Sequence, residues 1–165
     1  MTPADNAKAQ SEKTDPENIL ILELTTGPVE IKMLPDKAPE HVKRIKKLVQ
    51  EDFYDNVVFH RVIEGFMAQT GDPTGTGRGG SEYKDLPAEF SNVDFDRGTV
   101  GMARTQDPNS ANSQFFICFD DCSFLNGQYT VWGKVTKGME HVDALAVGEP
   151  PANPDLIVDA KLKSK

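Results

Sequence analysis

The chain has 165 residues, a length that suits one domain with a single hydrophobic core. Its 18 basic and 26 acidic residues give a net charge of −8, which argues against nucleic acids and anionic membranes as partners, because both require a basic surface. Two cysteines cannot form a disulfide-rich scaffold and suit a reducing compartment, so we expect a cytoplasmic protein. The 13 glycines and 11 prolines show no repeat, which favours many short strands over a helical bundle.

The N-terminal segment, residues 1–18, is polar and mixed in charge. It lacks the basic start and the apolar stretch that together mark a signal peptide. Because it contains too few apolar residues to offset the entropy lost on ordering, we predict a disordered arm over residues 1–18 and one folded domain over residues 19–165.

Short apolar runs dominate the rest of the chain. The first two, residues 19–24 and 29–33, flank a turn that contains Gly27 and Pro28, which is the pattern of a β-hairpin. Further runs, separated by Gly, Pro, Asn and Asp, predict additional strands. These runs cover residues 57–63, 66–69, 99–103, 114–119, 130–135 and 156–162.

Helical periodicity occurs at two places. From Pro39, which suits a first helical turn, apolar residues follow on one face and basic residues on the other. A shorter helix fits Met139, Val142 and Leu145 and ends before Gly148. Strands and helices do not alternate regularly, so a doubly wound sheet is not expected. The pattern favours a mainly β fold, a closed β-barrel capped by two α-helices.

Three motifs that could carry chemistry lack the context they need. Residues 75–80 match G-x-G-x-x-G, but no helical pattern follows, so they predict a glycine-rich surface loop and not a nucleotide site. No histidine stands at metal-ligand spacing from Cys118 and Cys122, so we expect free thiols, with no metal and no other cofactor. Ser113 lacks the G-x-S-x-G motif of a catalytic nucleophile.

Arg61 is unusual because it lies within an apolar run that is predicted to be a strand. On a pleated strand it shares a face with Phe59 and Ile63, and arginine is rarely buried without a partner. Two interpretations remain open: an arginine that reaches solvent or forms an internal ion pair, and a functional group. Gln69 lies nearby in the sequence and could hold the guanidinium.

Four blocks stand out by their order and spacing: FHRVIEGFMAQTGD, GRGG, MAR followed by NSANSQFFI, and FLNGQYTVWGKV. They resemble the cyclophilin family of peptidyl-prolyl cis-trans isomerases, and the resemblance covers about residues 19–162. The short 99–103 block and the compact loops are similar to the bacterial members. The resemblance implies an antiparallel barrel of about eight strands with a helix at each open end and a peptide groove on its outer face. It also implies isomerisation of X–Pro peptide bonds.

Carried over residue by residue, the resemblance implies that Arg61 is the catalytic arginine. Gln69 and Gln114 would orient the arginine and the bound peptide. The ring of the substrate proline is expected in a hydrophobic pocket, and the rest of the peptide beside Ala103 and a glycine-rich loop. The pocket residues are Phe66, Met67, Phe116 and Leu125, and the loop residues are Gly77 and Gly79.

Three further binding residues differ from those of the best-known eukaryotic members. Arg104 replaces an asparagine, Phe124 a tryptophan and Tyr129 a histidine. None of the three is expected to touch the arginine and the proline pocket. We therefore expect activity to be kept and the affinity for cyclosporin, an inhibitor of the family, to be weakened.

The expected partners are proline-containing peptides and unfolded or partly folded proteins, and the chain is expected to be a monomer. The alternative is a non-catalytic module or chaperone that binds proline-containing peptides. Arg61, Phe116 and Leu125 are all present, which favours the enzyme.

Overall fold

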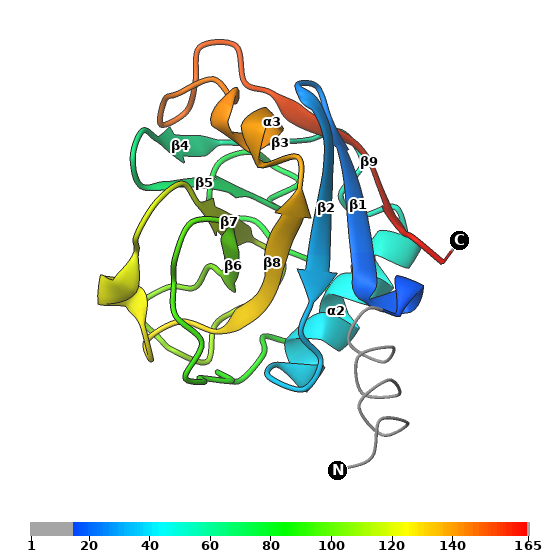
Figure 1. The fold of residues 1–165 in the computed structure, drawn as a ribbon, viewed down its shortest axis with the longest axis vertical. Coiled ribbons are helices and arrows are strands. Elements are labelled where there is room, and N and C mark those ends of the chain that lie inside the picture. The colour runs from blue at the N-terminus through cyan, green and yellow to red at the C-terminus, as the bar shows by residue number, and fades with distance from the viewer. Residues whose placement is uncertain (1–14, 165) are drawn as a thin grey trace, which may run out of the picture.

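The computed structural model describes residues 15–164. In this range one antiparallel sheet of nine strands curls strongly on itself, in the order β3-β9-β1-β2-β8-β6-β7-β5-β4 (Figure 1). The strands are β1 (Ile19–Leu24), β2 (Gly27–Met33), β3 (Val57–Val58), β4 (Arg61–Ile63), β5 (Met67–Thr70), β6 (Thr99–Met102), β7 (Phe115–Cys118), β8 (Val131–Lys137) and β9 (Leu156–Leu162).

Strands β1 and β2 form the predicted hairpin. Leu20 lies opposite Ile31, and Leu22 lies opposite Val29. All four side chains are fully buried, because residues directly opposite one another across a strand pair project to the same face. This hairpin therefore supplies one wall of the main core.

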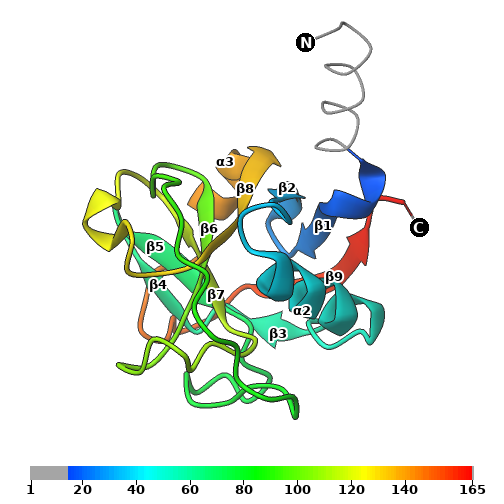
Figure 2. The same cartoon turned by 90° about the horizontal axis from the view of Figure 1, so that it is seen from below.

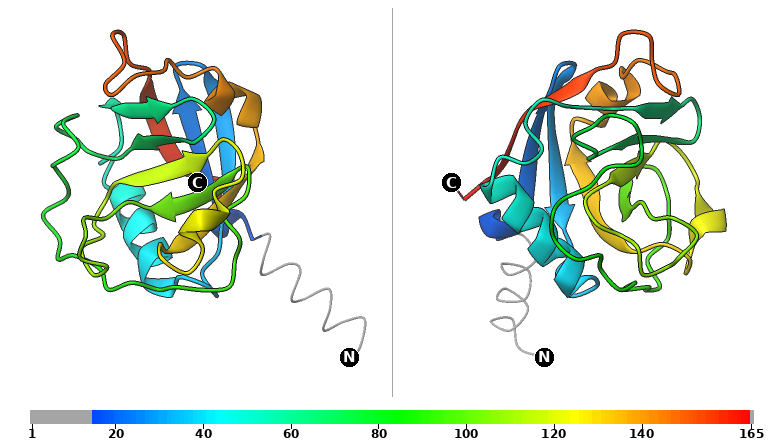
Figure 3. Two further views of the ribbon diagram at one scale, coloured as in Figure 1. Left: turned by 90° about the vertical axis from the view of Figure 1, so that its left-hand side faces the viewer. Right: turned by 180° about the vertical axis from the view of Figure 1, so that it is seen from behind.

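Two α-helices lie at opposite ends of the curled sheet. Helix α2 (Pro39–Gln50) has its proline in the first turn and packs its apolar face against β9. Helix α3 (Met139–Asp143) is shorter than predicted and packs against β2. Figure 1 shows α2 below the sheet and α3 above it, and Figures 2 and 3 give the same arrangement from other sides. Both helices are confirmed, and no helix in the described range is long and apolar enough to cross a membrane.

The mainly β fold with two helices is confirmed, with one difference in strand count and closure. The predicted run 57–63 is two strands, interrupted at Phe59 and His60. The first of them, β3, pairs with β9 and the second, β4, with β5, so they end the sheet on opposite sides. The sheet thus has nine strands and not about eight, and it is a strongly curled half-barrel whose end strands share no ladder within residues 15–164.

Side chains of β5 and β7 alternate between two hydrophobic clusters. Ala68, Phe115 and Ile117 face the main core inside the curl. Met67 and Phe116 face a second, smaller cluster on the outer side. Because both faces are covered, β7 is buried along its whole length. The outer cluster is the support on which the candidate site is built.

The N-terminal boundary differs from the predicted one. Residues 1–14 of the predicted arm lie outside the described residues. The end of that segment is ordered, because Pro16–Asn18 form a 3₁₀ turn (η1) capped by the Asp15 side chain. Asn18 is buried, and its Oδ1 accepts a hydrogen bond of 2.7 Å from Lys46 Nζ on α2. Order therefore starts before Ile19, because this polar turn finds partners on the domain.

Candidate functional site

One row of residues crosses four neighbouring strands at the outer face of the sheet. Arg61 on β4 lies opposite Gln69 on β5, Gln69 lies opposite Phe116 on β7, and Phe116 lies opposite Gly101 on β6. Residues in such a register share one face, so the sheet itself brings together side chains that are far apart in the sequence. The predicted Arg61, Gln69 and Phe116 meet in this row.

A small pocket of about 130 Å³ opens over this row. Its lining combines apolar side chains with two guanidinium groups, those of Arg61 and Arg104. Every residue that lines it was among the predicted site residues. They are Arg61, Phe66, Met67, Gln69, Ala103, Arg104, Phe116, Leu125 and Tyr129.

Gly101 shapes the floor of the small pocket. A Cβ at this position would lie 2.7 Å from the ring of Phe95 and 2.8 Å from the ring of Phe116. These two rings stack with centroids 5.7 Å apart directly above the glycine. A larger residue would therefore displace the Phe116 ring, which closes the base of the pocket.

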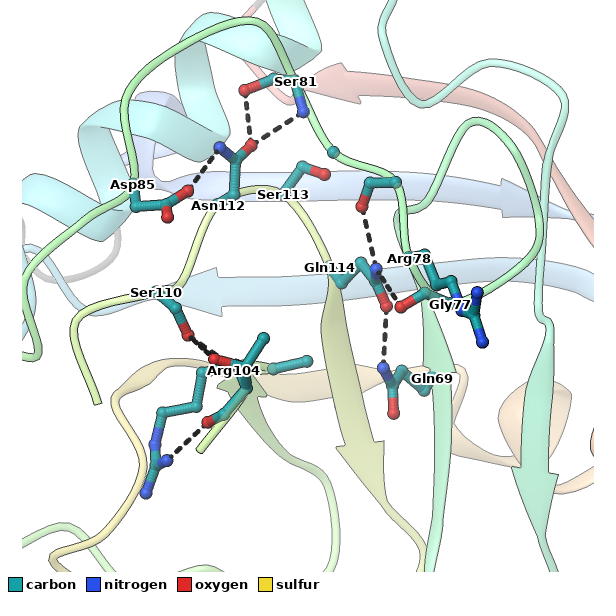
Figure 4. Close-up of a pocket in the computed structure, with 14 residues that line it drawn as sticks. Gln69, Gly77, Arg78, Ser81, Asp85, Arg104, Ser110, Asn112, Ser113 and Gln114 are labelled. Carbon is teal, nitrogen blue, oxygen red and sulfur yellow. Dashed lines mark hydrogen bonds between the residues drawn. The ribbon is translucent and has the colours of Figure 1, made fainter. Parts of the chain in front are cut away.

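A chain of hydrogen bonds leads away from Arg61 across the sheet. Arg61 Nη1 donates to Gln69 Oε1 over 3.4 Å, and Gln69 Nε2 donates to Gln114 Oε1 over 2.9 Å. Gln114 Nε2 in turn donates to the backbone oxygens of Gly77 (3.0 Å) and Gly79 (2.9 Å). The two glutamines thus connect the arginine to the glycine-rich loop, as Figure 4 shows for all but the first step.

Asp72 holds that loop in place from below. This fully buried carboxylate accepts hydrogen bonds from the backbone N–H groups of Thr74 (2.8 Å), Gly77 (2.6 Å) and Gly79 (3.0 Å). Burial by itself would raise the pKa of Asp72, but the hydrogen bonds from Gly79, Thr74 and Gly77 outweigh it and hold the pKa well below its usual range. The loop is therefore organised around a permanent anion.

A second, larger pocket of about 470 Å³ adjoins the first (Figure 4). The two pockets share three wall residues, Gln69, Ala103 and Arg104. Its upper wall in Figure 4 is a polar cluster in which Asn112 bonds both Ser81 and Asp85. The full lining is Gln69, Gly77, Arg78, Gly79, Gly80, Ser81, Asp85, Ala103, Arg104, Thr105, Ser110, Asn112, Ser113 and Gln114.

The prediction that Arg104 and Tyr129 do not touch the proline pocket is wrong. The guanidinium of Arg104 lies 4.4 Å from the ring centroid of Tyr129, and the Tyr129 ring packs edge-on against Phe116 at 5.8 Å. Both residues line the small pocket. Sequence spacing missed this because the contact depends on how the 126–130 turn folds back over the sheet.

Phe124 lies at the rim of the site. It stands on the 3₁₀ turn η2 (Ser123–Leu125), is 63% exposed and lines neither pocket. Its ring is 5.5 Å from that of Phe66, which does line the small pocket. Of the predicted site residues, Phe124 alone is outside both linings, while Gln114, Gly77 and Gly79 line the larger one.

Two residues at the site were not predicted. Glu149 Oε1 accepts a hydrogen bond of 2.9 Å from Arg61 Nε, and nothing in the local sequence marks this glutamate. Asp72 could have been found, since an aspartate before a Pro, Thr and Gly run is typical of a side chain that caps its own loop.

Comparison with known proteins identifies the family to which this chain belongs. The sequence profile described as "Cyclophilin type peptidyl-prolyl cis-trans isomerase/CLD" matches residues 19–162. The chain belongs to the cyclophilin family. It is 55% identical over 166 aligned residues to a probable peptidyl-prolyl cis-trans isomerase of Brucella suis, with 91% of this chain and 85% of the relative covered. The resemblance to bacterial members is thereby confirmed.

Solved structures agree with this cyclophilin in fold. A cyclophilin from Hirschia baltica matches with a TM-score of 0.86 and 31% identity, covering 100% of this chain and 82% of the other. A cyclophilin-type isomerase of Cryptosporidium parvum, solved in the presence of the dipeptide Ala-Pro, matches with a TM-score of 0.82 and 29% identity, covering 87% and 98%. By homology this cyclophilin is a peptidyl-prolyl cis-trans isomerase (EC 5.2.1.8), and the family implies proline-containing peptides as its substrates.

Proposed function

We propose that Arg61 catalyses the isomerisation while the small pocket holds the substrate proline. In this proposal the ring packs on Phe116, Met67 and Leu125, and the guanidinium reaches the prolyl nitrogen. The observation that supports it most directly is that one pocket of about 130 Å³ is lined both by these apolar side chains and by Arg61.

The chemistry of the X–Pro bond explains why such a site suffices. Rotation crosses a barrier of about 18–20 kcal/mol, because the nitrogen lone pair is shared with the carbonyl group. Twisting the amide returns the lone pair to the nitrogen, which then accepts a hydrogen bond more readily. A guanidinium aimed at that nitrogen binds the twisted state more tightly than either planar isomer, and this difference lowers the barrier. An arginine also remains charged at any working pH.

The neighbouring groups contribute orientation. Gln69 and Gln114 tie the guanidinium to the glycine loop, so that less freedom is lost when the twisted amide forms. The apolar pocket excludes water and strengthens the interaction between the guanidinium and the amide nitrogen. No step of this mechanism requires a nucleophile or a cofactor.

Turnover of a short X–Pro peptide tests the proposal against a binding module. Wild-type protein and Arg61→Ala are compared in a protease-coupled assay, and peptide binding is measured separately by calorimetry. We expect the variant to bind the peptide and lose most of its turnover. A wild-type protein that binds without accelerating isomerisation would support the non-catalytic alternative.

We further propose that the natural substrates are unfolded or partly folded proteins, and that the chain acts as a cytoplasmic monomer. A pocket that recognises mainly the proline ring can bind proline in many different sequence contexts. The buried, unpaired thiols of Cys118 and Cys122 agree with a reducing compartment. Acceleration of the proline-limited refolding of a model protein tests the first part. Cell fractionation tests the location, and sedimentation tests the oligomeric state.

A further inference from the structure

Two arginines, Arg61 and Arg104, line the small pocket, and in the described part of the chain only one of them has an ion-pair partner. Arg61 is paired with Glu149 at 2.9 Å. Arg104 has no carboxylate within 4 Å among residues 15–164, and no acidic residue lines the small pocket. Within residues 15–164, the small pocket therefore has one guanidinium, that of Arg104, without an ion-pair partner.

The guanidinium of Arg104 is nevertheless held in a fixed orientation. Its Nε and Nη2 donate to the backbone oxygen of Gln128 at 3.1 and 2.7 Å, and its Nη1 donates to the backbone oxygen of Thr105 at 2.8 Å. One face lies on the ring of Tyr129. Carbonyl groups and a ring orient the cation without cancelling its charge, so binding an anion here requires little further ordering.

The position of Arg104 determines which part of a bound peptide it can contact. It belongs to the wall shared by the small pocket and the larger one, as Figure 4 shows from the side of the larger pocket. A peptide that places its proline in the small pocket and extends into the larger one passes this side chain. The flanking residue, and not the proline, then meets Arg104. Two other charged residues, Arg78 and Asp85, also line the larger pocket, and Asp85 accepts a hydrogen bond from Asn112.

We propose that Arg104 selects substrates with an aspartate or glutamate one or two residues from the proline. This inference rests on the proposed function, because it takes the small pocket as the proline site. The net charge of −8 repels acidic peptides at long range, but that effect is screened by salt, whereas a direct contact persists. The preference is therefore a local one.

The test is a set of otherwise identical peptides with Glu, Gln or Lys at each of the two positions on either side of one proline. Both peptide ends are blocked, so that the only variable carboxylate is a side chain. Isomerisation is measured by NMR exchange at 0.15 M salt, which avoids a coupling protease that reads the same residues. We expect kcat/KM for Glu to exceed that for Gln by about 1.5- to 5-fold at one position or more, the range for partly exposed ion pairs.

Three variants assign the preference to Arg104. In Arg104→Gln the ratio of Glu to Gln peptides should fall to about one, and in Arg104→Lys it should be retained in part. Lys43→Gln removes the same charge from an exposed position on α2 and should retain the wild-type ratio. Equal rates for Glu and Gln peptides in the wild type, or a ratio that persists in Arg104→Gln, would overturn the inference. Loss of the proposed function would instead appear as full turnover in Arg61→Ala.

Discussion

Arg61 Nε and Glu149 Oε1 lie 2.9 Å apart although 88 residues separate them in the sequence. Both side chains remain about half exposed, at 43% and 57%. An exposed pair of this kind adds at most about 1 kcal/mol to stability. Its consequence is geometric, because it fixes one edge of the guanidinium and leaves the opposite side directed towards Gln69 and the small pocket.

Glu149→Gln should therefore slow isomerisation without unfolding the protein. We expect kcat to fall by about 1.5- to 5-fold, the equivalent of a partly exposed ion pair, with little change in KM. In an Arg61→Ala background the same substitution should have no further effect, because its partner is already gone. Glu140→Gln, at a carboxylate that is 75% exposed away from the site, is the matched control. Additive effects in the double variant would contradict a positioning role.

Most of the fold follows from patterns that are local in the sequence. The hairpin, helix α2 and strand β9 lie where periodicity places them, because each buries one face against the same core. The break at Phe59 and His60 could not be predicted, since no glycine or proline interrupts the run and only pairing with different neighbours divides it. Closure of the sheet is likewise decided by strand partners and not by composition.

The candidate site could be predicted only in part from patterns in the sequence. The strand register gathers Arg61, Gln69 and Phe116. The residues alone suggested that Gln69 holds Arg61, but only the family resemblance added Phe116 to the group. Glu149 and the stacking of Arg104 on Tyr129 depend on loops that fold back over the sheet. Contacts of this kind leave no periodic trace in the sequence.

Arg61→Ala should keep the fold and lose most isomerase activity. A hydrogen bond from a charged donor contributes about 1.5–3 kcal/mol, which corresponds to a loss of roughly 10- to 150-fold in kcat/KM. Binding of proline-containing peptides should survive, since the apolar pocket remains. Arg97→Ala removes an arginine that pairs with Asp143 away from the pockets, and it should retain wild-type turnover. Near-normal turnover in a folded Arg61→Ala protein would contradict the mechanism.

Asp72→Asn should destabilise the protein and reduce its activity together. The substitution removes the charge that organises the loop, so we expect a loss of about 1.5–3 kcal/mol in the free energy of unfolding. When Gly77 and Gly79 move, Gln114 loses the backbone oxygens that accept its hydrogen bonds. The hydrogen bonds that connect Gln114 through Gln69 to Arg61 then hold the guanidinium less firmly, so kcat should fall. Urea denaturation and the peptide assay measure the two effects. Asp36→Asn, at an exposed carboxylate, should change neither.

Activity should be nearly constant between about pH 6.5 and 8. His60 precedes Arg61 in the chain, and burial lowers its pKa below 6.5, opposed by Asp72 and assisted by Arg61. Its charged form is therefore disfavoured in this range, and EDTA should not alter the rate. A bell-shaped pH profile in this window would require an acid–base pair that the site does not contain.

The lowered pKa of His60 also predicts that the free energy of unfolding decreases at acidic pH. The unfolded chain binds a proton at His60 near pH 6.5 and the folded chain only below that, because burial disfavours the charged ring. The buried Nδ1 of His60 also has no hydrogen-bond partner within the described residues. The contribution to stability is complete above pH 6.5 and is lost as the pH falls from 6.5 through the lower folded pKa. Urea denaturation between pH 7.5 and 5 should show this loss, and His60→Gln should make it shallower. An unchanged slope would assign the loss to other groups.

Phe124 should limit the affinity for cyclosporin without limiting catalysis. Its ring stands 63% exposed beside Phe66 at the mouth of the small pocket, where a tryptophan would add an indole N–H donor and a larger apolar surface. A gained hydrogen bond contributes about 0.5–1.5 kcal/mol, and the wider ring adds apolar contact. Phe124→Trp should therefore tighten binding by roughly ten- to a hundredfold in Kd, measured by calorimetry. Turnover of short peptides should stay within a few-fold, because Phe124 does not line the pocket that is proposed to hold proline. If cyclosporin binds both proteins equally, the determinant is elsewhere, and Tyr129→His and Arg104→Asn are the variants to measure next.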